Sequence, residues 1–211
     1  MKTVDYILAE KLLKINAIKL QPQNPFTWGS GWTSPIYADN RRTLSYPDVR
    51  TFIKLELARM VLERFEGVDA IAGVDNGAIA QGALVADQLA LPYAYVRSTP
   101  KDHGLENLIE GDLRPGSRVV VIEDLVSTGG SSLKAVEAIR SAGAEVAGIL
   151  AIFTFNFEAA GEHFSKAGVS FAALTDYDVL IKVAHKEGYL NDAEVELLLQ
   201  WRQDPAGWAL A

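Results

Sequence analysis

Two adjacent carboxylates, Glu123 and Asp124, directly follow the apolar run 119–122. Such a run is typical of a strand buried on both faces of a parallel sheet, so the acids come where that strand should surface. The chain continues as "LVSTGGSS", and apolar residues then recur at helical spacing, with Ser131 or Ser132 as the expected N-cap. The pattern predicts that carboxylates and exposed backbone N–H groups meet at one point of the molecule.

The loop after the acids suits a single phosphate group. Ser127, Thr128, Gly129 and Gly130 can present hydroxyls and several backbone N–H groups at a helix N-terminus, where the helix dipole also favours an anion. The spacing matches neither a Walker loop, whose lysine is missing, nor the Gly-x-Gly-x-x-Gly dinucleotide fingerprint. Because the carboxylates would repel a di- or triphosphate, we expect them to accept hydrogen bonds from ribose hydroxyls. Without this loop, the acid pair would be read equally well as a solvated strand end.

A second group of candidate residues lies in the stretch 97–117, which has little periodicity. A connection this long in a compact domain is usually functional or disordered. It carries Arg97, Lys101 and His103, which could bind an anion but would otherwise form an ordinary charged surface loop. The segment 75–77, Asp-Asn-Gly, reads equally well as a tight turn or as part of a site.

Alternating elements are expected to position these groups. The expected strands are 68–74, 91–96, 118–123, 145–153 and 169–174, and the expected helices are 1–15, 48–65, 78–90, 131–142, 157–167 and 191–203. This alternation predicts an α/β fold, a parallel sheet flanked by helices on both faces. Ligands of such sheets bind beyond the carboxyl ends of the strands, where 75–77, Arg97 and the acid pair all fall. Residues 21–41 read as loops and short strands of a small N-terminal subdomain, 1–45, within a single domain, 1–211.

The composition excludes several classes of protein. A net charge of −7 argues against sequence-independent binding to nucleic acid or to anionic membranes. No apolar run is long enough for a membrane span, and the acids in the N-terminal segment make it an amphipathic helix rather than a signal peptide. The absence of cysteine excludes disulfides, thiolate metal sites and cysteine nucleophiles, and fits a cytoplasmic protein.

Three segments together carry a resemblance to a known family. "FTWGSGWTSPIYADNR", "YVRSTPKDHGLENLIEG" and "VVVIEDLVSTGGSS" resemble the orotate phosphoribosyltransferases in order and spacing, over most of the chain. The acidic motif alone resembles only the wider group of type I phosphoribosyltransferases. The pattern Arg97-x3-Lys101-x-His103-Gly104 and the pattern Ser30-Gly31-x2-Ser34-Pro35 are similar to the orotate branch.

The resemblance implies a reaction and a set of site residues. Orotate and phosphoribosyl pyrophosphate would give orotidine 5′-monophosphate and pyrophosphate in de novo pyrimidine biosynthesis, with Mg2+ as cofactor and no protein ligand assigned to the metal. The implied catalytic residues are Arg97, Lys101, His103 and Asp124. The implied phosphoribosyl pyrophosphate site comprises Glu123, Asp124, Leu125, Val126, Ser127, Thr128, Gly129, Gly130 and Ser131. The implied orotate contacts are Ser30, Gly31, Ile36, Tyr37 and Ser127, and Trp28 and Trp32 are read as packing or rim residues.

The resemblance also implies a homodimer, because in this family the 98–111 loop reaches the active site of the partner subunit. His103 is not expected to be a general base, since the reacting nitrogen of orotate needs little help once deprotonated. The chain departs from residues common in the family at Gly29, Asp75, Ser98 and Phe155.

Two alternatives share the acidic loop. One is a phosphoribosyltransferase for another base. The other is a regulator that senses phosphoribosyl pyrophosphate and binds nucleic acid, which should show a basic face or an added helix-turn-helix.

Overall fold

The computed structural model describes residues 2–29, 31–99 and 108–208. Its helices are α1 (Val4–Lys14), α2 (Pro47–Arg64), α3 (Ile79–Leu89), α4 (Gly130–Ser141), α5 (Glu158–Lys166), α6 (Tyr177–Lys186), α7 (Asp192–Gln203) and the 3-10 helix η1 (Asn40–Ser45). Its strands are β1 (Ile18–Leu20), β2 (Phe26–Thr27), β3 (Thr33–Ser34), β4 (Ile36–Ala38), β5 (Ala70–Val74), β6 (Tyr93–Val96), β7 (Ile109–Glu110), β8 (Arg118–Val126), β9 (Glu145–Thr154) and β10 (Phe171–Asp176).

The central sheet has six strands in the order β10-β9-β8-β5-β6-β7. All neighbours are parallel except β7, which pairs antiparallel with β6 through Tyr95 and Glu110. The stretch 97–117, expected to be a loop throughout, therefore contributes an antiparallel edge strand. Two residues are too few to show an alternating pattern in the sequence, which is why periodicity did not indicate this strand.

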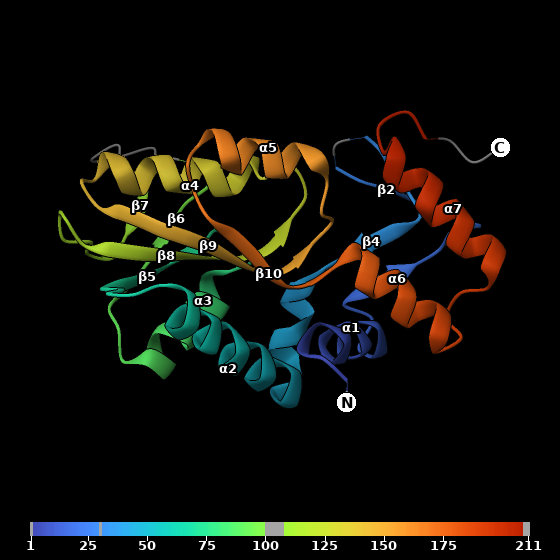
Figure 1. The fold of residues 1–211 in the computed structure, drawn as a ribbon, viewed down its shortest axis with the longest axis horizontal. Coiled ribbons are helices and arrows are strands. Elements are labelled where there is room, and N and C mark those ends of the chain that lie inside the picture. Colours follow the sequence, from blue (N-terminus) through green and yellow to red (C-terminus); the bar gives the residue numbers. More distant parts are fainter. Residues whose placement is uncertain (1, 30, 100–107, 209–211) are drawn as a thin grey trace.

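Helices cover both faces of the sheet, as the alternation predicts (Figure 1). On one face α4 and α5 pack against a core that includes Val119, Val121 and Phe164. On the other face α2 and α3 pack against a second core that includes Val120 and Ile122. Alternate residues of β8 thus enter different cores, which explains why the apolar run is continuous.

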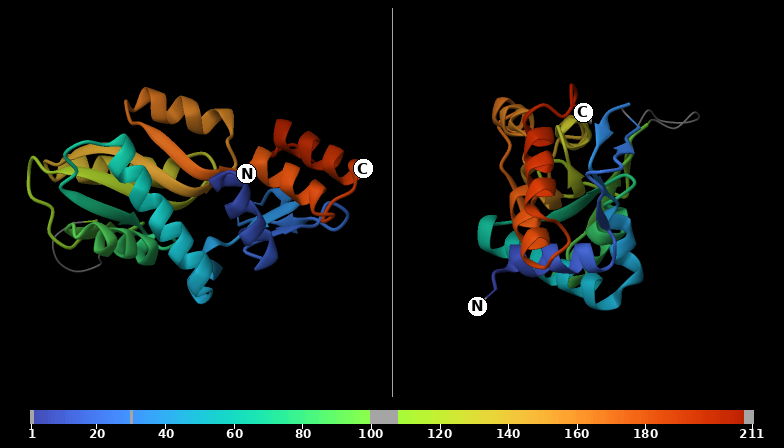
Figure 2. Two further views of the ribbon diagram at one scale, coloured as in Figure 1. Left: turned by 60° about the horizontal axis from the view of Figure 1, so that its bottom comes forward. Right: turned by 90° about the vertical axis from the view of Figure 1, so that its right-hand side faces the viewer.

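Short antiparallel strands, β1 with β4 and β2 with β3, form a separate group at one end of the sheet. They lie at the same end as α1, α6 and α7 (Figures 1 and 2). Helix α6 was not expected from the sequence. It begins directly after β10, with the Asp176 carboxylate accepting a hydrogen bond from the Val179 N–H, so no loop residues separate the two elements.

Two boundaries near the acid pair differ from expectation. Strand β8 does not end at the acids, because Leu125 and Val126 still pair with β9. The N-cap of α4 is Gly129 in the left-handed region, φ 81°, rather than Ser131 or Ser132. No described helix has the length and apolar character needed to cross a membrane.

Candidate active site

The acid pair lies near the carboxyl end of β8, where Glu123 is buried and Asp124 is half-buried. The Ser132 hydroxyl, in the first turn of α4, donates to Oε2 of Glu123 at 2.9 Å. Burial, and after it the charge of Asp124, raise the pKa of Glu123 to about 8. Burial also raises the pKa of Asp124, against the opposing influence of Glu123 and Arg41. The pair is therefore disposed to hold a proton, or to bind hydroxyl donors, at neutral pH.

The turn after β5 closely approaches Asp124. A Cβ atom on Gly77 would overlap the Asp124 carboxyl group, so only glycine fits without displacing that acid. The segment 75–77, which the sequence left open as a plain turn or as part of a site, thus contacts the acid pair directly.

Two of the unusual residues in this chain contact each other. The Asp75 carboxylate accepts hydrogen bonds from the Ser98 hydroxyl at 3.1 Å and from the Ser98 backbone N–H at 3.3 Å. The Asp75 N–H donates to the Val96 carbonyl at 2.9 Å, so the turn and the end of β6 are joined at several points. The negative charge of Asp75 on this turn is therefore stabilised by two hydrogen-bond donors of Ser98.

The candidate cationic residues are only partly described. Arg97 follows β6, its backbone N–H donates to the Leu108 carbonyl at 2.8 Å, and its Nη1 lies 3.7 Å from Oε1 of Glu110 in β7. The antiparallel β6–β7 pair thus fixes where Arg97 leaves the sheet. Lys101 and His103 lie outside the described residues.

The loop 127–131 joins β8 to the N-terminus of α4. No side chain caps this helix terminus, and a Cβ on Gly130 would meet nothing within 4 Å, so the loop is open on that side. From behind, α5 supports it: Nδ1 of His163 lies 2.8 Å from the Thr128 carbonyl oxygen. The Phe164 ring would come within 2.8 Å of a Cβ on Gly129, so this glycine is needed for both its positive φ and its packing.

A pocket of about 250 Å³ opens beside the acid pair. It is lined by Thr27, Trp28, Gly29, Tyr37, Ala38, Leu125, Ser127 and Phe155. Of the expected base contacts, Tyr37 and Ser127 line it, whereas the Ile36 side chain is fully buried in the core. Gly31, φ 87°, donates its N–H to the Trp28 carbonyl in the hairpin turn, and Ser30 lies outside the described residues.

Trp28 and Phe155 are pocket walls that sequence reasoning did not assign to the site. Their ring centroids are 5.1 Å apart, which joins the β2–β3 hairpin to the residue that follows β9. In the sequence, Phe155 stands out as a departure from the family, and Trp28 reads as a packing or rim residue. Residue type alone does not separate a packing aromatic from one that also faces a pocket.

Asn40 is a buried residue that connects the N-terminal strands to the acid pair. Its side-chain Nδ2 donates to the backbone carbonyl of Asp124 at 2.7 Å. Its backbone carbonyl accepts a hydrogen bond from the Thr43 hydroxyl at 2.6 Å. Gln81 of α3 extends this buried group by donating to the Thr43 hydroxyl at 3.4 Å. The residue lies within "YADNR", but a contact across 84 positions has no signal in local sequence patterns.

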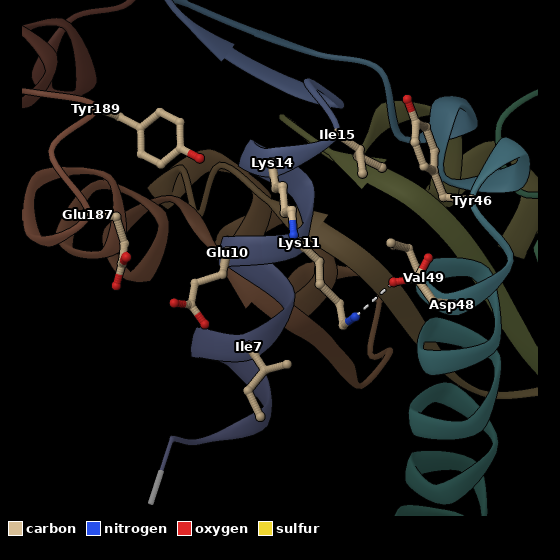
Figure 3. Close-up of a pocket in the computed structure, with 10 residues that line it drawn as sticks. All are labelled: Ile7, Glu10, Lys11, Lys14, Ile15, Tyr46, Asp48, Val49, Glu187 and Tyr189. Carbon is tan, nitrogen blue, oxygen red and sulfur yellow. Dashed lines mark hydrogen bonds and ion pairs between the residues drawn. The ribbon is translucent and has the colours of Figure 1, made fainter.

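A larger hollow, of about 570 Å³, lies between α1, the start of α2 and the chain after α6 (Figure 3). Its charged lining is mixed in sign, and Lys11 is paired with Asp48 at 3.2 Å. It contains neither the acid pair nor the glycine-rich loop. The chemistry therefore points to the smaller pocket at the end of β8.

Comparison with known proteins agrees with this geometry. Residues 53–176, which contain the whole β5–β10 sheet and the acidic loop, match the model of the phosphoribosyl transferase domain. The orotate phosphoribosyltransferase of Phocaeicola vulgatus is 65% identical over 208 residues, which cover 99% of this chain and 98% of that protein. The orotate phosphoribosyltransferase of Porphyromonas gingivalis is 61% identical over 210 residues, which cover 100% of both chains. The chain belongs to the orotate phosphoribosyltransferase family.

A solved orotate phosphoribosyltransferase supports the fold assignment. The crystal structure from Aeropyrum pernix is 30% identical, has a TM-score of 0.75, and covers 87% of this chain and 99% of that one. The predicted sheet flanked by helices is thereby confirmed as the type I phosphoribosyltransferase fold. Membership makes the chain an enzyme with orotate phosphoribosyltransferase activity in pyrimidine biosynthesis.

The carboxylate oxygens of Glu123 and Asp124 are suitable ligands for a magnesium ion whose other ligands come largely from the substrate. Orotate phosphoribosyltransferases commonly use Mg2+. Within the described ranges, no three acidic or histidine side chains are grouped so as to hold a metal by themselves. Mg2+ typically takes one or two carboxylates together with substrate phosphates and water, which matches the acid pair beside an open loop.

Proposed function

We propose that the chain transfers the 5-phosphoribosyl group from phosphoribosyl pyrophosphate to orotate, and that the cleft at the end of β8 is the reaction site. One observation supports this most strongly. Residues 123–131 provide, in succession, the acid pair, two residues that line the 250 Å³ pocket, and the open N-terminus of α4. A ribose bound to the acids would therefore have a phosphate site on one side and a base pocket on the other.

The acid pair binds the ribose and stabilises the positive charge that develops on its ring during the reaction. Glu123 and Asp124 accept hydrogen bonds from the two ribose hydroxyls, and residues 127–131 bind the 5′-phosphate through backbone N–H groups. Displacement at the anomeric carbon passes through an oxocarbenium-like state, as in glycoside cleavage. The negative charge that the acid pair keeps near the ring stabilises this positive charge without reorganisation at the moment of reaction.

The pyrophosphate leaves on the side of the turn 75–77. Arg97 stabilises the growing negative charge of the leaving group, and Lys101 and His103 share this role on the strength of the family resemblance. When bound, Mg2+ would neutralise pyrophosphate charge, with Asp124 among its ligands. Interactions that strengthen as the bond breaks raise the rate of the chemical step rather than ground-state affinity alone.

The base occupies the pocket between the β2–β3 hairpin and the end of β9. Tyr37 and Ser127 contact orotate directly, and Ser30, Gly31 and Ile36 belong to the same N-terminal subdomain, 1–45. We assign no general base, because the reacting nitrogen of orotate needs little help once it is deprotonated. The aromatic and apolar wall also limits the water that could hydrolyse the activated sugar.

The enzyme acts as a homodimer in which each 98–111 segment completes the partner's site. This assignment rests on the resemblance of the loop.

We also infer a cytoplasmic location, which the absence of cysteine favours.

The decisive experiment follows the ultraviolet absorbance of orotate after addition of phosphoribosyl pyrophosphate and Mg2+. We expect loss of the orotate signal that requires both additions, with no reaction of uracil or hypoxanthine in parallel. Turnover of another base but not of orotate would contradict the proposal. Tight binding of the sugar diphosphate without any turnover would instead favour a regulatory role.

A further inference from the structure

Helix α7 lies next to the proposed base pocket although it contributes no residue to its lining. Trp201, in the last turn of α7, is fully buried, and its indole N–H donates to the Thr33 carbonyl in β3 at 3.1 Å. That bond spans 168 positions of sequence and ties the helix to the β2–β3 hairpin. Helix α7 and the N-terminal strands lie at the same end of the molecule in Figure 1 and in the left view of Figure 2.

The Trp201 ring contacts both aromatic walls of the pocket from behind. Its centroid is 5.6 Å from that of Trp28 and 5.9 Å from that of Phe155. The rings of Phe157 and Tyr177 also contact it, each with its centroid 5.7 Å away. Aromatic pairs at these separations attract one another beyond simple area burial, and their rings have few rotamers.

Trp201 therefore packs against both pocket walls at once. Trp28 is carried by the hairpin and Phe155 by the chain after β9, so they belong to different parts of the fold. Trp201 contacts both rings and also holds the hairpin through Thr33. Helix α7 is itself held in place by a hydrogen bond from the Tyr177 hydroxyl to the backbone carbonyl of Leu198, at 2.8 Å.

We propose that Trp201 is a positioning residue for base recognition, and that α7 sets the shape of the orotate pocket without contacting the substrate. The inference rests on the proposed assignment of this pocket to the base. A purely structural role would lower stability and affect both substrates together. A positioning role for the base affects orotate selectively.

The test is steady-state kinetics with Trp201→Phe, which keeps an aromatic ring and removes only the N–H donor and part of the ring area. We expect the KM for orotate to rise about three- to tenfold, which corresponds to the loss of one net hydrogen bond. We expect the KM for phosphoribosyl pyrophosphate to change less than about twofold, since the acid pair and α4 are not contacted. Equal changes in both values, or no change in either, would overturn the inference.

A milder second variant covers the case in which Trp201→Phe does not fold. Tyr177→Phe removes only the hydroxyl that seats α7 and leaves every ring of the cluster in place. We expect a smaller rise in the KM for orotate, again without a matching rise for phosphoribosyl pyrophosphate. An unchanged KM for orotate in this variant would likewise contradict the inference.

Two control variants separate the possible failures. Val119→Ala, in a fully buried position at the start of β8, should lower the melting temperature without changing the ratio of the two KM values. Ala38→Leu places extra atoms in the pocket lining and should weaken orotate binding directly. If Ala38→Leu has no effect on orotate, the pocket assignment itself is wrong. If it does and the Trp201 and Tyr177 variants do not, only the role of α7 is wrong.

Discussion

Gly77 and Asp124 form a contact that leaves no room for a side chain on the glycine. We predict that Gly77→Ala forces the Asp124 carboxyl group away from its position and lowers kcat/KM for phosphoribosyl pyrophosphate. Loss of a hydrogen bond to a charged group predicts a decrease of more than about tenfold. Gly161→Ala is the matched control, because a Cβ at that helical position meets nothing within 4 Å. Wild-type kinetics in Gly77→Ala would show that the acid can move without consequence.

Glu123 makes the stability of the ligand-free protein depend on pH. Burial raises its pKa in the folded state from 4.5 to about 8, so between these values the native state holds a proton that the unfolded state has lost. Stability therefore falls as pH rises through this window, by up to about 1.4 kcal/mol per pH unit for one proton.

We predict that Glu123→Gln flattens this dependence, because glutamine stays neutral and can still accept from the Ser132 hydroxyl. Urea unfolding of both proteins between pH 5 and pH 9 is the measurement. The variant should become more stable relative to the wild type as pH rises. Parallel curves would mean that Glu123 ionises at its ordinary pKa.

At the scale of elements, the sequence predicted the strands and helices that have clear periods. The five strands expected from apolar runs all form. The missed elements have local reasons: β7 is two residues long, and α6 follows β10 without a loop. The N-cap of α4 was misplaced because Ser132, a good capping residue by type, bonds Glu123 instead.

The candidate site was predictable where one continuous segment makes it, and not where distant segments meet. The acid pair and the loop 127–131 follow from their own spacing. The contacts of Asn40 with Asp124 and of Asp75 with Ser98 join separate segments, so neither residue reveals its partner. The same holds for Trp201 and Thr33, which meet only through the tertiary fold.

The bond between Asp75 and Ser98 links the turn after β5 to the segment that leaves β6. We predict that Asp75→Ala and Ser98→Ala each lower kcat/KM for phosphoribosyl pyrophosphate, since Arg97 is held between these contacts and β7. Because one interaction is lost in either case, the double variant should be no worse than the single variants. A coupling free energy of about 0.5–1.5 kcal/mol is expected from the double-mutant cycle.

Ser117→Ala is the control for this cycle, because its hydroxyl donates to the nearby Arg114 carbonyl at the opposite end of β8. We expect it to keep wild-type kinetics. Strictly additive losses in the Asp75 and Ser98 variants would show that the two residues act independently.

At the scale of the whole molecule, the arrangement of strands bears on the proposed homodimer. The segment between Arg97 and Ile109 leaves and re-enters the sheet at β6 and β7, which form its edge. The described ends of this segment, Arg97 and Leu108, therefore lie near the periphery of the sheet rather than at its centre. In the proposed homodimer, this edge of the sheet is where the segment would leave toward a second site.

Subunit exchange tests the shared site directly. Lys101→Ala and Asp124→Asn should each be almost inactive alone. If the segment carrying Lys101 completes the partner's site, a mixed dimer contains one site with both native residues. Random exchange of equal amounts should then restore roughly a quarter of the wild-type activity, because half of the dimers are mixed and each has one intact site. Differently tagged subunits would verify by native mass spectrometry that mixed dimers form. Their formation without any return of activity would mean that each subunit uses its own Lys101.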